Sequence, residues 1–125
     1  MAQETWLGWK LASSDRAGLL ARFPPRYAEA VADHITFGRA EGAPPLPDTD
    51  RARIVGRADD GMGVEALVVE LAGTTERPTG GTYHITWSLA DGREAHESND
   101  VIAKRGWEPV EPMPEVRIER ARWPN

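Results

Sequence analysis

One four-residue string occurs twice in this chain, with only its last aromatic residue changed. Residues 34–37 read His-Ile-Thr-Phe, and residues 84–87 read His-Ile-Thr-Trp. Because each residue type makes up roughly 5% of an average protein, a given histidine carries such a tail by chance on the order of one time in several thousand. Side chains alternate between the two faces of a strand. Each string therefore predicts a strand with an imidazole and a hydroxyl on one face and two apolar side chains on the other.

Length and composition limit the kinds of protein that this chain can be. Its 125 residues predict one domain over 1–125, and the absence of cysteine excludes disulfides and thiol chemistry. No apolar run approaches the roughly 20 residues of a membrane span, and no signal peptide is evident, so we expect a cytoplasmic protein without a membrane partner. The net charge of −5 disfavours extended binding along nucleic acid, although a few local cations could hold one phosphate.

Alternation and turn signals divide the chain into strands and two main helices. We expect strands over residues 5–11, 33–37, 51–58, 64–71, 82–89 and 115–122, and helices over 14–22 and 98–105. Residues 27–33 fit either a helical turn or the approach to a strand. The glycine-rich turn at 59–63 predicts a hairpin. Ser13 or Ser14 is expected to cap the first helix, and Ser98 the second.

This order of elements predicts an α+β fold with largely antiparallel sheets. Each half of the chain holds one His-Ile-Thr strand. Two lobes could therefore bring the strings face to face.

The repeated residues suit the hydrolysis of a phosphodiester without a metal. One neutral imidazole, from His34 or His84, could take a proton from water while the other, protonated, gives a proton to the departing oxygen. The hydroxyls of Thr36 and Thr86 could donate to the non-bridging oxygens, where the transition state concentrates negative charge. A 2′,3′-cyclic phosphate is an attractive substrate because its ring is strained. Which histidine is the base and which the acid stays open.

Paired His-x-Thr strings are the hallmark of the two-histidine (2H) phosphoesterases, and this chain resembles that family. The resemblance is strongest to the cyclic phosphodiesterase domain of plant and fungal tRNA ligases, whose glycine-to-Glu-Ala/Ser-Asn segment is similar to residues 87–99, Trp-Ser-Leu-Ala-Asp-Gly-Arg-Glu-Ala-His-Glu-Ser-Asn. It implies a bilobal α+β fold with one string on a central strand of each lobe. It also implies that His34 and His84 are the catalytic acid and base, and that Thr36 and Thr86 hold the phosphate.

The expected activity follows from the same resemblance: opening of a 2′,3′-cyclic phosphate on a nucleotide or RNA end, commonly leaving a 2′-phosphate. The two histidines stand 50 residues apart, a shorter spacing than in many members of the family. The natural substrate and the oligomeric state therefore stay open.

Five further residues are candidates for binding the substrate. Trp6 and Lys10 lie opposite the leucine face of the first strand, where the indole could stack on a base and the amine could bind phosphate. Arg39 directly follows the first string and could also approach a phosphate. Through the resemblance, Ser98 and Asn99 border the site. Each of the five also has an ordinary structural explanation. Trp6 and Lys10 could lie on an exposed edge strand, and Arg39 could be a loop charge. Ser98 and Asn99 could be a helix cap and its neighbour.

The histidines allow two other readings. A three-histidine metal site formed with His96 would leave both threonines unused, so we expect neither a metal nor a cofactor. A binding module that holds a nucleotide or cyclic phosphate without turnover would use the same four residues. Because all four are intact, the sequence favours the enzyme, with the binding module as the alternative.

Overall fold

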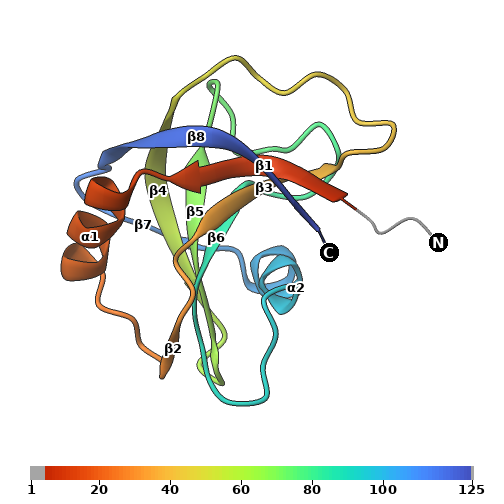
Figure 1. The fold of residues 1–125 in the computed structure, drawn as a ribbon. Helices are drawn as coiled ribbons and strands as arrows, with labels where there is room; N and C mark the ends of the chain where they lie inside the picture. The colour runs from red at the N-terminus through yellow and green to blue at the C-terminus, as the bar shows by residue number, and fades with distance from the viewer. Residues whose placement is uncertain (1–4, 125) are drawn as a thin grey trace.

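A computed structural model describes residues 5–124, which form two helices and eight strands (Figure 1). The elements are, in chain order, β1 (Thr5–Leu11), α1 (Ser13–Arg22), β2 (Glu29–Ala30), β3 (His34–Arg39), β4 (Arg51–Asp59), β5 (Val64–Glu70), β6 (His84–Leu89), α2 (Glu97–Arg105), β7 (Glu108–Pro109) and β8 (Glu115–Pro124). The predicted α+β class, with two helices and a mostly antiparallel sheet, is confirmed.

Six of the strands close into a ring. They follow the order β6, β3, β1, β8, β4 and β5, and β5 pairs with β6 to complete the circuit. Each of these pairings is antiparallel. The short strands β2 and β7 add to β6 and β4. Every strand of the ring therefore has a neighbouring strand on each side, although β3 and β6 pair only at Ile35 and Ile85 among the described residues. Beyond that pair, side chains bond to the β3 carbonyls, and Thr79 Oγ1 donates to Phe37 O.

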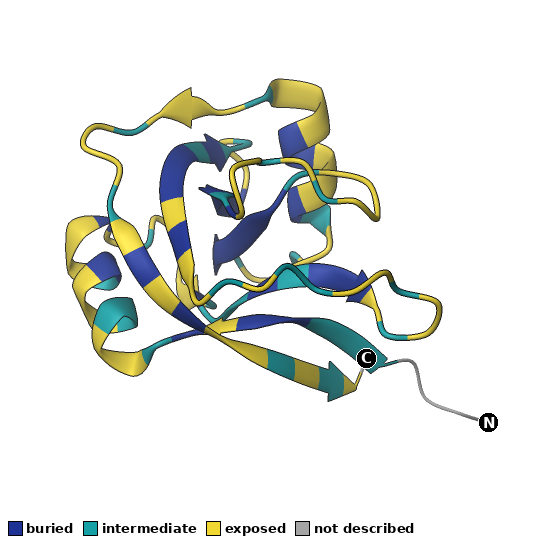
Figure 2. Ribbon diagram, turned by 90° about the horizontal axis from the view of Figure 1, so that it is seen from above, coloured by how far each residue is buried: buried dark blue, intermediate teal, exposed yellow. Residues whose placement is uncertain are grey.

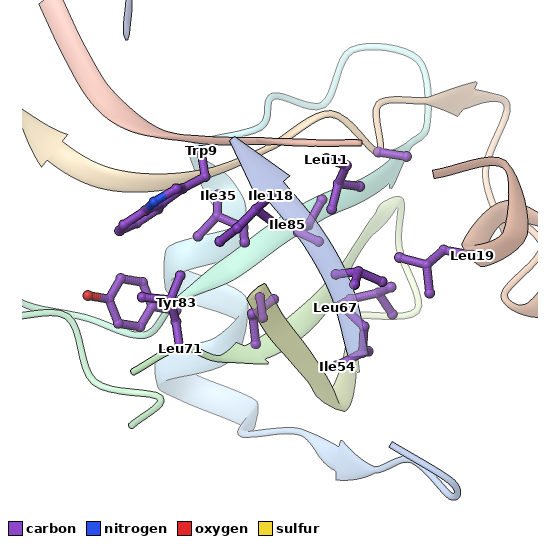
Figure 3. Packing of buried hydrophobic residues seen from close by; sticks show 14 of the residues in the cluster. Trp9, Leu11, Leu19, Ile35, Ile54, Leu67, Leu71, Tyr83, Ile85 and Ile118 are labelled. Atoms are coloured by element: carbon purple, nitrogen blue, oxygen red, sulfur yellow. The ribbon is translucent and has the colours of Figure 1, made fainter. Parts of the chain in front are cut away.

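The interior of the ring holds the larger of two hydrophobic clusters. Trp9, Ile35, Leu67 and Ile85 are fully buried there, because alternate residues of each strand point inward (Figure 3). Helix α1 adds Leu19 to this cluster. The two helices lie on opposite sides of the strands, and both are largely exposed with short buried stretches (Figures 1 and 2).

The smaller cluster lies beneath α2. Val101 and Ile102 of that helix pack with Val64, Ala66 and Val68 of β5. Strand β5 is therefore buried on both faces, which explains why residues 64–69 are all buried.

A buried carboxylate ties the chain before β2 to the sheet. Glu65 is fully buried and accepts hydrogen bonds from Arg57 Nε at 2.7 Å and from Ser88 Oγ at 2.6 Å. It also accepts one from the backbone N–H of Arg26 at 3.0 Å. A buried charge with this many donors is compensated, so the network stabilises the segment that leads into β2.

The predicted helix caps are wrong at both helices. Helix α1 starts at Ser13 with Ala12 as its N-cap, and no side chain bonds to the cap position. Helix α2 starts at Glu97, one residue before the prediction, so Ser98 lies inside the first turn and is buried. Carbonyls of the preceding turn replace the cap: the N–H of Ser98 donates to Ala95 O at 3.1 Å. The hydroxyl of Ser98 is thereby left for another partner.

Most strands begin and end within two residues of the prediction, and the hairpin at 59–63 is confirmed by the antiparallel pairing of β4 with β5. Residues 27–33, which were ambiguous, contain β2. The two-lobed arrangement is not confirmed. The strands that carry the strings, β3 and β6, are neighbours in one sheet, paired through Ile35 and Ile85.

Candidate active site

Both His-Ile-Thr strings face one cleft of about 440 Å³ beside the junction of β3 and β6. Residues from β1, β3, β6, β8, helix α2 and two loops line it: Trp6, His34, Thr36, Arg77, His84, Thr86, Ala95, His96, Asn99, Trp123 and Pro124. The sequence-predicted histidines and threonines are therefore brought together, although they come from segments 50 residues apart.

The local cause is the alternation predicted for each string. Ile35 and Ile85 are fully buried and pair across the two strands. The residues on either side of each isoleucine must then point away from the core. Since the strands run antiparallel and pair through these isoleucines, the flanking histidines and threonines of both strings line the same cleft.

His84 is a buried, neutral imidazole. Its Nδ1 lies 2.8 Å from the carbonyl oxygen of Thr82, and because a carbonyl only accepts, Nδ1 carries the proton. Burial lowers the pKa of His84 to about 4. The Thr82 carbonyl opposes this effect, and the charges of Arg77 and His34 add to it. Nε2 is thus unprotonated at neutral pH and can accept a proton.

His34 has a different environment. Its Nδ1 lies 3.1 Å from Oδ2 of Asp33, and the carboxylate can only accept, so this nitrogen also donates. The side chain is 28% exposed, and its ring lies 4.5 Å from that of Trp123 with a 53° angle between the planes. Of the two rings, His34 is therefore the more exposed, and it is the one that lies beside a carboxylate.

The two threonines also differ. No residue among 5–124 makes a hydrogen bond to the hydroxyl of Thr36, which is partly exposed. Thr86 is buried, and its Oγ1 donates to Ala95 O at 3.2 Å. Ser98 Oγ, 2.9 Å away, must then donate to Thr86, since a hydroxyl has only one proton. Thr36 is therefore the hydroxyl that is ready to donate to a ligand, whereas Thr86 ties the loop before α2 to β6.

Arg77 brings a positive charge to the cleft, and the sequence reasoning missed it. Its Nε donates to Gly80 O at 2.8 Å, Nη2 to Asn99 Oδ1 at 3.0 Å, and Nη1 to Thr36 O at 3.4 Å. Burial lowers the pKa of Arg77, but a guanidinium is so basic that it stays charged. The only signal in the sequence is an arginine within the glycine-rich loop that leads into β6.

Trp123 was also missed, because the last strand was predicted to stop at residue 122. Strand β8 continues to Pro124 and pairs Trp123 with Trp6. Gly8 lies under the indole: a Cβ at this position would come within 2.9 Å of Trp123 Cη2 and would overlap the carbonyl oxygen of Ile35. Glycine at this position therefore lets the ring lie over β1 and reach His34.

The remaining predicted residues are divided by the structure. Trp6 and Asn99 line the cleft. Lys10 does not line it, and its amine lies 3.8 Å from the Asp33 carboxylate. Arg39 lies with its guanidinium 5.7 Å from the centre of the Trp6 ring and lines an adjoining hollow instead. Ser98 is fully buried and does not line the cleft, but it hydrogen-bonds to two residues that do, Thr86 and Ala95.

His96 lies at the exposed rim, where its Nε2 is 2.5 Å from Glu94 Oε2. Among residues 5–124, no group of three or more His, Cys, Asp or Glu side chains is placed to hold a metal ion. The three histidines share a cleft without forming such a group.

Comparisons with protein-family models, with curated proteins and with solved structures returned no match. Within residues 5–124, neither helix has the length and apolar character needed to cross a membrane.

Proposed function

We propose that the protein is a metal-independent 2′,3′-cyclic phosphodiesterase that opens the cyclic phosphate of a nucleotide or RNA end. The observation that carries the proposal is the convergence of both His-x-Thr strings on one cleft together with a partly buried arginine, Arg77. Two imidazoles in unlike environments, one hydroxyl donor and one guanidinium are the groups that this reaction requires.

The different environments of the two rings support one assignment of the roles that the sequence left open. His84 is the general base: its Nε2 accepts a proton from the attacking water, whose oxygen forms the new bond to phosphorus. His34 is the general acid: it gives its proton to the ribose oxygen as the phosphorus–oxygen bond breaks. Loss of the bond to the 3′ oxygen leaves a 2′-phosphate. Each proton transfer contributes typically ~10²–10⁴-fold to the rate.

The phosphate would be held from one side of the cleft. The Thr36 hydroxyl and the Arg77 guanidinium, which lie beside each other through the Thr36 carbonyl, would donate to the non-bridging oxygens. A guanidinium binds two such oxygens at once, which fixes the phosphorus relative to both rings.

The resemblance to 2H phosphoesterases supports this reading through the motif residues. The proposal also includes the two halves of that family's fold. Each half would carry one string, and the halves would meet where Ile35 pairs with Ile85. A binding module without turnover is the second candidate. One observation favours it: the Thr86 hydroxyl already donates within the protein, so only one of the two motif hydroxyls is available to a phosphate.

Phosphorus NMR on 2′,3′-cyclic nucleotides in the presence of EDTA tests the proposal, since it reports both turnover and the bond that breaks. We expect hydrolysis in EDTA and a loss of about 10²-fold or more in His34→Asn and in His84→Asn. Arg53→Gln, on the exposed side of β4 and outside the cleft, supplies the control and should retain turnover. Binding without hydrolysis would establish the second candidate, and a strict requirement for a metal would refute the mechanism.

A further inference from the structure

The residue before the first string is a carboxylate that contacts the histidine of that string. Asp33 does not line the cleft, yet its Oδ2 lies 3.1 Å from Nδ1 of His34. Successive side chains of a regular strand point to opposite faces, so neighbours in sequence do not normally meet there. Strand β3 begins only at His34. The contact therefore depends on the irregular chain that leads into the strand.

That irregular chain contains a backbone conformation that alanine rarely adopts. Ala32 has a φ of 43°, in the left-handed region, and such a conformation persists only where the surrounding contacts impose it. Ala32 is fully buried, and its N–H donates to Thr86 O at 3.0 Å. Its carbonyl accepts a hydrogen bond from Arg16 Nε at 2.6 Å. Strand β6 and helix α1 thus fix the turn that precedes Asp33.

Strand β1 holds Asp33 from the other side. The backbone N–H of Leu11 donates to Asp33 O at 3.2 Å, and the Lys10 amine lies 3.8 Å from the carboxylate. Lys10 is also the residue of β1 that pairs with His34. The backbone and the side chain of Asp33 are therefore both anchored beside the imidazole.

We propose that Asp33 is the positioning residue of His34 and holds its imidazole with Nδ1 protonated and Nε2 left for the substrate. A carboxylate only accepts, so Nδ1 donates as long as the contact lasts. The proton that His34 gives to the ribose oxygen must then come from Nε2. Trp123, whose ring centre lies 4.5 Å from that of His34, restricts the ring further. The effect on turnover rests on the proposed function, whereas the state of the ring does not.

Asp33→Asn tests this role because it keeps the size of the side chain and the backbone bond to β1. The amide of asparagine can accept from a protonated Nδ1 or donate to a bare one, so the ring is no longer restricted to one tautomer. We expect kcat for a 2′,3′-cyclic nucleotide to fall about tenfold or more, with KM changed by less than about twofold. KM should change little because Asp33 lies outside the cleft.

A second exposed aspartate supplies the matched control. The carboxylate of Asp48 lies 3.6 Å from Arg120, far along the chain from both strings, and Asp48→Asn removes the same charge. This variant should leave kcat and KM unchanged. An unchanged kcat in Asp33→Asn, or an equal loss in Asp48→Asn, would overturn the proposal.

Nitrogen NMR of the histidine rings measures the same role without turnover. At a pH where the rings are neutral, His34 should carry its proton on Nδ1 in the wild type, and the form protonated on Nε2 should appear in Asp33→Asn. His84 is an internal control, because its Nδ1 lies beside the Thr82 carbonyl in both proteins. A wild-type His34 protonated on Nε2, or a spectrum of this ring that Asp33→Asn does not change, would overturn the proposal.

The two measurements separate this inference from the proposed function. If the wild type hydrolyses no cyclic phosphate, the proposed activity fails, and the NMR comparison still decides the role of Asp33. A change of tautomer at His34 but not at His84 would then support the positioning role. A loss of kcat in Asp33→Asn without any change at the His34 ring would refute it.

Discussion

Burial of His84 makes the stability of this protein depend on pH in a defined direction. The pKa of this ring falls from 6.5 in the unfolded chain to about 4 in the folded protein. Between these values the unfolded chain binds a proton that the folded protein does not, so stability falls as the pH drops through this window. Above about pH 6.5 both states are neutral and the residue adds no pH dependence.

The size of the effect follows from the same two pKa values. Each pH unit between them is worth about 1.4 kcal/mol, so the full penalty is about 3 kcal/mol below pH 4. Through this residue, the free energy of unfolding at about pH 5 is about 2 kcal/mol lower than at about pH 7.5. For a urea dependence of roughly 1–2 kcal/mol per molar, the unfolding midpoint should move by about 1–2 M.

Urea denaturation near pH 5 and near pH 7.5 measures this difference, and variants isolate it from other titrating groups. In His84→Asn the amide can still donate to Thr82 O but cannot titrate, so the variant should lose about 2 kcal/mol of the pH dependence. His96→Asn removes an exposed imidazole and should retain it. An equal pH dependence in the wild type and in His84→Asn would refute the assignment, as would an NMR titration of the His84 ring near its free value.

Three further changes test other parts of the structure. Arg77→Lys keeps the charge but loses the two-pronged guanidinium, so kcat/KM for a cyclic phosphate should fall about tenfold or more, and an unchanged value would exclude the arginine from the site. Thr36→Val should lower kcat by about 10²-fold with little effect on unfolding, whereas Thr86→Val should lower the unfolding midpoint; the reverse pattern would contradict the hydroxyl assignment. Glu65→Ala leaves an arginine without its buried partner and should cost about 3 kcal/mol in urea denaturation, against almost nothing for Glu119→Ala on the surface.

Local patterns were sufficient to predict the strands and the faces of the two strings. Alternation requires only nearest neighbours, and it placed Ile35 and Ile85 in the core and the histidines outside it. The closure of the sheet could not be predicted in this way. It depends on the pairing of β1 with β8, where Thr5 lies opposite Pro124, and no local signal specifies a contact over that separation.

The caps and the binding residues show a second limit. Ser98 has the residue type of a cap, but a turn that satisfies the helix N–H groups by itself left its hydroxyl free to bond to Thr86. Arg77 was missed because three acceptors that the fold brings together hold its guanidinium at the cleft. Two of them are backbone carbonyls, which every residue carries and which no sequence pattern marks.

Two nearly identical strings acquire different chemistry from their positions in the sheet. Strand β6 pairs with β5 on one side and with β2 and β3 on the other, and the loop before α2 covers Thr86, so all six of its residues are buried. Strand β3 has no such cover, and His34 and Thr36 stay partly exposed. The repeat therefore supplies the residue types, and the unequal burial of β3 and β6 gives the two imidazoles different environments. In the proposed mechanism this difference would separate the base, His84, from the acid, His34.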